Sequence, residues 1–167
     1  AMMAALYYHP EAYTTSGPKL MGRNAAGESF IRGFLTHSKA NEFWAQLQHP
    51  DHAQHFARTA AAYSRNKPIK AVCNDSIAAL AQVGVLYYPA PGIGEQAFHR
   101  AAYGHGAWSL CGITHTTSSS RSMDALADLI TSPVQPWDAV ICTSNAVKDN
   151  VSCVLQAQAE YLTNRLG

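Results

Sequence analysis

The chain has 167 residues, of which 47% are hydrophobic and 14% are charged, and its formal net charge is +1. These values are typical of one globular domain and exclude an intrinsically disordered chain. Neither the acidic nor the basic residues form a long run, which argues against non-specific electrostatic binding to nucleic acid.

Targeting signals and cysteine usage indicate the compartment. No apolar run reaches the roughly 18 residues needed to span a bilayer, and the first residues do not resemble a signal peptide. The four cysteines form no Cys-x-x-Cys pair and are expected to be buried free thiols in a reducing compartment: Cys73, Cys111, Cys142 and Cys153. We therefore expect a cytoplasmic protein. No basic amphipathic helix demands a membrane, and peripheral membrane association stays open.

Short apolar runs alternate with helix-length segments, which predicts an α/β domain with a mostly parallel sheet. In chain order we expect a strand at residues 4–8, a helix at 25–37, a strand or helix at 41–47, a helix at 52–63, a strand at 69–73, a short helix at 76–82, a strand at 83–88, a helix at 95–103, a strand at 109–114, a helix at 123–130, a strand at 139–143 and a helix at 145–166. No linker is visible in the sequence. A single Rossmann-like, three-layer domain over residues 1–167 is the expected organisation.

Parallel strands joined by helices place their functional loops at the carboxyl ends of the strands. Four such places follow Tyr8, Tyr88, Thr114 and Thr143. Tyr88 stands in a stiff, proline-rich strand end, and an aromatic ring there suits the flat face of a sugar. Core packing is the alternative explanation for at least one of the two tyrosines at 87–88.

The segment after the expected strand at 109–114 is the most informative one. His115 is followed by five hydroxyl residues at 116–120, among them Thr116 and Thr117. Hydroxyls at a helix start cap the free N–H groups, which can also face an anion or a sugar hydroxyl. A histidine at a strand end can donate or accept a hydrogen bond near neutral pH. Helix capping alone also explains these residues.

Two segments carry a family resemblance. The strand that ends in His115-Thr116-Thr117-Ser118 resembles the N-terminal domain of retaining glycosyltransferases of the GT4 kind, which have the GT-B fold. Residues 138–147, with the sequence DAVICTSNAV, are similar to a later segment of that family, in which a strand is followed by a serine and a helix. Both segments occur in the family's order and at about its spacing. The resemblance covers residues 4–167 and is strongest at 109–150.

The resemblance implies an enzyme that moves a sugar from a nucleotide-sugar donor to an acceptor hydroxyl, with retention of configuration and without a metal or cofactor. His115 would be the catalytic residue that contacts the donor sugar. Ser144 and Asn145, at the start of the last helix, would be substrate-binding, although helix capping alone explains them too.

The same resemblance implies that backbone amides around Gly27 and Glu28 approach the donor diphosphate, a role that suits glycine and a helix N-terminus. The family's usual glycine pair is replaced here by Ala25-Ala26, so an ordinary helix-start role for Gly27 is the alternative. Arg23 would contact a phosphate or lie in solvent.

Two other constellations are not expected to be sites. His49, His52 and His55 lie three residues apart, but no carboxylate or cysteine completes a metal set in the sequence. Cys111 and His115 would be roughly 13 Å apart along a strand, too far for a nucleophile and its base.

The family's second domain carries two glutamates seven residues apart, and no two glutamates of this chain have that spacing. We therefore expect an acceptor-side, N-terminal half that is inactive alone, with a C-terminal nucleotide-sugar domain of the same chain as its missing partner and an acceptor of unknown identity. Two alternatives remain: a free-standing α/β module that binds a nucleotide or metabolite, and an interaction protein whose sugar-transfer cleft has decayed.

Overall fold

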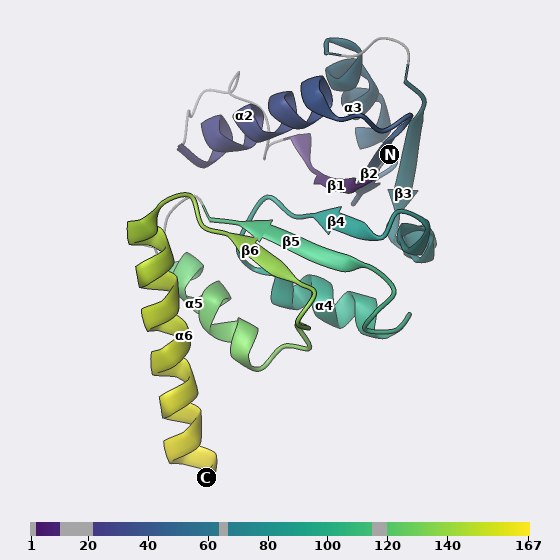
Figure 1. Ribbon diagram of the computed structural model, residues 1–167. Helices are drawn as coiled ribbons and strands as arrows, with labels where there is room; N and C mark the ends of the chain where they lie inside the picture. Colours follow the sequence, from purple (N-terminus) through teal and green to yellow (C-terminus); the bar gives the residue numbers. More distant parts are fainter. Residues whose placement is uncertain (1–2, 11–21, 64–66, 115–119) are drawn as a thin grey trace. The chain divides into compact units, whose positions relative to one another are not determined.

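A computed structural model describes residues 3–10, 22–63, 67–114 and 120–167, with only the backbone for 22–28 (Figure 1). The chain divides into two compact units, Ala1–Tyr87 and Tyr88–Gly167. Each unit has its own strands and helices.

The first unit is a parallel sheet with helices between its strands. Its elements are β1 (Ala5–Tyr8), α2 (Gly22–His37), β2 (Phe43–Leu47), α3 (His52–Ala61), β3 (Ile69–Cys73), the 3-10 helix η1 (Asn74–Gln82) and β4 (Val85–Tyr87). The strands lie in the order β3-β2-β1-β4, and every neighbouring pair is parallel. Tyr8 is in register with Leu47, which is in register with Cys73, so three carboxyl ends lie level along one edge.

The core of the first unit lies between this sheet and the helices α2 and α3. It is a cluster of buried residues from both layers: Leu6, Tyr8, Ile31, Leu35, Phe43, Ala45, Leu47, Phe56 and Ala60. All five residues of β2 are buried. A central parallel strand is covered on both faces and shows no alternation, which explains why residues 41–47 fitted strand and helix equally well.

The second unit also alternates helices with parallel strands. Its elements are α4 (Ile93–Ala101), β5 (Ser109–Ile113), α5 (Ser120–Ala127), the 3-10 helix η2 (Asp128–Ile130), β6 (Ala139–Ile141) and α6 (Asn145–Leu166). Gly112 of β5 is in parallel register with Val140 of β6. The segment that begins at Tyr88 runs along β5, because the Tyr88 N–H donates to the Cys111 carbonyl at 2.8 Å and the Ile113 N–H donates to the Ala90 carbonyl at 3.2 Å.

Two glycines let the layers of the second unit approach closely. A Cβ at Gly112 would lie 2.6 Å from the Ala90 oxygen and 2.8 Å from a methyl of Ile93, and a Cβ at Gly94 would lie 2.4 Å from the Ser132 hydroxyl. A larger residue at either position would push α4 away from its neighbours.

The predicted Rossmann-like α/β class with a parallel sheet is confirmed, since six parallel strands alternate with helices. The helix predicted at 145–166 has those bounds in α6, whereas the one predicted at 76–82 begins at Asn74 and is a 3-10 helix. The helix predicted at 123–130 begins at Ser120 and ends in η2. Within the described ranges, none of the helices combines the length and the apolar character that crossing a membrane requires.

Candidate functional site

Thr114 joins the carboxyl ends of β5 and β6. Its side chain is completely buried, and its N–H donates to the Ile141 carbonyl at 3.0 Å. Its hydroxyl donates to the same carbonyl at 3.3 Å and accepts the N–H of Thr143 at 3.3 Å. These three bonds hold the last residue before His115 against the last residues before Ser144. Parallel α/β sheets bind ligands at such carboxyl ends.

His115, Thr116 and Thr117 lie outside the described residues. The structure therefore places the strand that leads to them and the serine that follows the neighbouring strand, but not the three side chains. Their proposed contacts stay predictions.

Ser144 is the N-cap of α6. Its backbone is extended, with φ −156° and ψ 166°, and its hydroxyl accepts the Val147 N–H at 3.1 Å. The hydroxyl still has its own O–H to donate, and the other backbone N–H groups of the first turn, including that of Asn145, are also left for a ligand. The side chains of Ser144 and Asn145 are both exposed.

Tyr88 is half-buried and is held by α4. Burial raises the pKa of its phenol, the nearby Glu95 carboxylate raises it further, and a hydrogen bond with Gln96 lowers it. A phenol is protonated at neutral pH even at its ordinary pKa of 10.0, and the raised pKa extends that range, so the Tyr88 hydroxyl can both donate and accept a hydrogen bond. Gln96 is itself buried, with 6% of its surface exposed. No pattern in the sequence predicted that Gln96 would be the partner of Tyr88.

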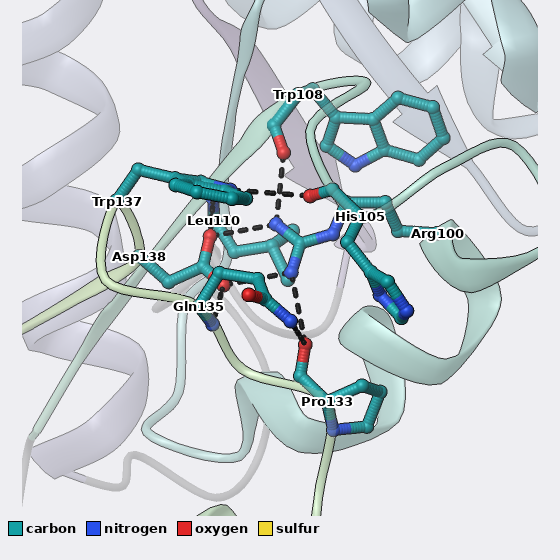
Figure 2. A network of polar contacts seen from close by, with 8 residues as sticks. All are labelled: Arg100, His105, Trp108, Leu110, Pro133, Gln135, Trp137 and Asp138. Atoms are coloured by element: carbon teal, nitrogen blue, oxygen red, sulfur yellow. Dashed lines mark hydrogen bonds and ion pairs between the residues drawn. The ribbon is translucent and has the colours of Figure 1, made fainter.

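A buried ion pair anchors the amino end of β6, the end opposite to the candidate site (Figure 2). Arg100 of α4 and Asp138 both have side chains with 0% exposure, and they make two parallel bonds of 2.7 and 2.8 Å. Arg100 also donates to the Trp108 carbonyl at 2.8 Å and to the Pro133 carbonyl at 3.2 Å. The guanidinium therefore ties α4 to the residues that precede β5 and β6.

The Asp138 carboxylate also orders the backbone around it. It accepts the Leu110 N–H at 2.8 Å from β5 and the Gln135 N–H at 2.8 Å from the turn before β6 (Figure 2). Asp138 is the first residue of the segment that resembles the glycosyltransferases. Its complete burial makes it an anchor for β6 rather than a ligand-contacting group.

The residues predicted to approach a diphosphate lie in α2 of the first unit. This helix includes Gly22, three residues before the expected start, so Gly27 lies in its second turn. A backbone N–H at that depth belongs to the helix's own hydrogen-bond ladder, and the N–H groups of the first four residues are the free ones. The side chains of Arg23 and Glu28 lie outside the described part of the chain.

Histidines gather at the carboxyl ends of β1 and β2. His9 and His52 are in edge-on contact with ring centroids 4.9 Å apart, and His49 lies 6.0 Å from His52. Tyr8 hydrogen-bonds His55, whose pKa is lowered by burial and then by the charges of Arg58 and His52. Among the described residues, no three His, Cys, Asp or Glu side chains are arranged to hold a metal ion.

The described cysteines are free but not fully buried, which corrects the expectation of buried thiols. Cys73, Cys111 and Cys142 are half-buried, and Cys153 is exposed on α6. Cys153 lies on an exposed side of the long helix. The apolar character of a cysteine side chain did not predict this exposure. Burial raises the pKa of the Cys111 thiol, which makes it a poor nucleophile at neutral pH.

The chain matches no protein-family model, and no curated protein or solved structure is significantly similar to it.

Proposed function

We propose that the chain is the N-terminal, acceptor-side half of a GT-B glycosyltransferase, which transfers a sugar from a nucleotide-sugar donor to an acceptor hydroxyl. The observation that carries this proposal is the set of bonds from Thr114 to Ile141 and Thr143. They fasten together the carboxyl ends of β5 and β6, the two strands in the segments that resemble the family. A site built from both segments is favoured at that edge.

The roles follow from the chemistry of each residue. His115 contacts the donor sugar, and the hydroxyls of Thr116 and Thr117 bind sugar or phosphate oxygens. The free N–H groups at Asn145 and the positive end of α6 suit an anionic phosphate. Tyr88 offers an aromatic face and a neutral hydroxyl to the acceptor.

We further propose a phosphate-binding role for the start of α2 in the first unit. Arg23 lies in the first turn of that helix, where a cation and free N–H groups attract a diphosphate together. Gly27 and Glu28 follow in the next turn. We also propose a cytoplasmic location, where the nucleotide sugar is the soluble partner.

The test is a product assay on the natural full-length protein with UDP-, GDP- and ADP-sugars, scored by nucleotide release. Release from one donor, lowered at least about tenfold by His115→Ala, supports the proposal. Ser152→Ala, on the exposed surface of α6, serves as the matched control and should keep full turnover.

A second measurement uses the 167-residue chain alone. Two-domain enzymes of this kind react between their halves, so the chain should show no turnover with any nucleotide sugar. Measured turnover would refute its assignment as an inactive half. No release by the full-length protein from any donor would favour a free-standing module that binds a nucleotide or metabolite.

A further inference from the structure

The first unit contains a groove of about 450 Å³ that none of the roles above uses. Its lining includes the apolar residues Ala4, Gly33, Phe34 and Tyr87, together with His37 and Lys39. Helix α2 leads from the carboxyl end of β1 to the amino end of β2, so its last residues lie at the amino edge of the sheet. The α2 side of the groove is therefore at the amino edge of the sheet, and Tyr87, the last residue of β4, lines it from the strand beside β1, where it is in register with Leu6. Its volume lies within the usual range of small-molecule pockets, about 300–1,000 Å³.

Gly33 keeps this groove open at a cost to the helix. A glycine in a helix interior is less favourable than alanine by about 1 kcal/mol. Packing does not require it, because a Cβ at Gly33 would meet no described atom within 4 Å. Gly94 and Gly112 differ, since a Cβ at either would collide with a neighbour. The structural consequence of Gly33 is open space in the groove that a larger side chain would enter.

The chemistry of the lining defines the kind of ligand that would fit this space. The rings of Phe34 and Tyr87 meet edge to face with centroids 5.9 Å apart, and an aromatic ligand can pack against such rings. His37 and Lys39 are exposed, and the described lining contains no carboxylate. The last carbonyls of α2 would repel an anion, but Lys67 donates to the carbonyl of Ser38, the residue that follows the helix, at 2.7 Å and so brings a positive charge to this end of α2.

We propose that this groove binds a small planar aromatic anion, with its ring against Phe34 and Tyr87 and its charged group beside Lys39 and His37. None of the residues that line the groove has a role in the sugar transfer proposed above, so the two proposals can be tested separately. The aromatic rings supply apolar contact, and the two basic side chains select for charge.

An NMR titration of the ¹⁵N-labelled 167-residue chain tests the proposal, with 2-naphthalenesulfonate as the probe and 2-naphthylmethanol as its neutral counterpart. We expect saturable shifts of the backbone amides of Gly33, Phe34 and Lys39. The sulfonate should bind at least about fivefold more tightly than the alcohol, and Lys39→Gln should remove most of that difference.

Gly33→Leu provides the blocking variant, because its side chain enters open space and should leave the fold intact. It should weaken binding of the sulfonate by at least about tenfold. Thr36→Leu is the matched control, since Thr36 is exposed on the same helix and does not line the groove. The unfolding midpoint of both variants checks that each remains folded.

Three results would overturn the proposal. Unchanged binding by folded Gly33→Leu would remove the groove as the site. Equal affinity for the sulfonate and the alcohol would remove the anion preference. The absence of saturable shifts at Gly33, Phe34 and Lys39 at millimolar probe would show that the groove is not a binding site for this class of ligand.

Discussion

Arg100 and Asp138 are separated by 38 residues, and their completely buried side chains meet in two parallel bonds of 2.7 and 2.8 Å. The pair joins a helix to the residue that starts the last strand of the second unit. Because neither charge reaches water, each depends on the other for its solvation.

Removing one member of this pair should be costly. Asp138→Ala leaves the Arg100 guanidinium buried without its anion and also leaves the N–H groups of Leu110 and Gln135 without an acceptor. We expect a loss of about 3–5 kcal/mol in the free energy of unfolding, measured with urea. The double change Arg100→Met, Asp138→Leu should lose clearly less than the sum of the single changes. Additive losses would contradict the mutual dependence.

Thr114→Val tests the bonds between the strand ends. Valine keeps the shape of threonine but cannot bond the Ile141 carbonyl or accept the Thr143 N–H. We expect a loss of about 1–3 kcal/mol in unfolding free energy and a large chemical-shift change at the Thr143 amide. The exposed Thr131→Val should stay within about 0.5 kcal/mol of the wild type. Equal effects of the two variants would show that the Thr114 hydroxyl does not hold the strand ends.

Ser144→Ala tests the cap of α6. Loss of the bond to the Val147 N–H should destabilise the second unit by about 1 kcal/mol. Ser144→Asp should retain stability, because a carboxylate accepts the same bond and suits the positive end of a helix. Ser152→Ala, within the same helix, should lose nothing. A thermal unfolding series on the three variants measures this order.

His55 should make the first unit sensitive to acid. Burial and the charges of Arg58 and His52 lower the pKa of His55 below its ordinary value of 6.5. The folded chain therefore binds this proton less tightly than the unfolded chain does. The stability due to neutral His55 is fully present above the unfolded pKa and is lost as the pH falls through the lowered folded value.

The corresponding experiment compares unfolding free energies of wild type and His55→Gln from about pH 7.5 to about pH 5. The variant should show a shallower decline on acidification, because glutamine does not titrate. His99→Gln, exposed on α4, controls for the loss of any histidine and should keep the wild-type slope. An identical decline in all three proteins would mean that His55 does not cause the acid sensitivity.

The elements were predictable where local signals agree. Helix α6 was placed at both ends, because Ser144 is a strong N-cap residue and a glycine follows Leu166. Strand β2 was ambiguous because all five of its residues are buried, so its sequence shows no alternation of apolar and polar residues that would distinguish a strand from a helix. The start of α2 was set three residues late, since Gly22 and Arg23 carry no recognisable cap.

The candidate site was less accessible to prediction. Ser144 and Tyr88 could be predicted as site residues because they follow strands. The contacts that hold β6, from Thr114 and between Arg100 and Asp138, join residues far apart in the sequence. Nothing in the sequence of the helix predicted at 95–103 distinguishes Arg100 from a solvated arginine. In the structure it is the largest fully buried side chain described. Likewise, only the fold shows that the Gln96 side chain meets Tyr88.

The long helix α6 has a further consequence for motion. It has 22 residues, a length of about 33 Å, and extends beyond the shorter helix α5 that lies beside it (Figure 1). Its one buried residue is Val151. The only buried residue is thus near the start, partly buried residues continue to Leu162, and Tyr161 and Leu166 are largely exposed. Helices without tertiary support fray. Amide hydrogen exchange should consequently quicken steadily from Val151 towards Arg165, so that the far turns of α6 open many times for each unfolding of the second unit.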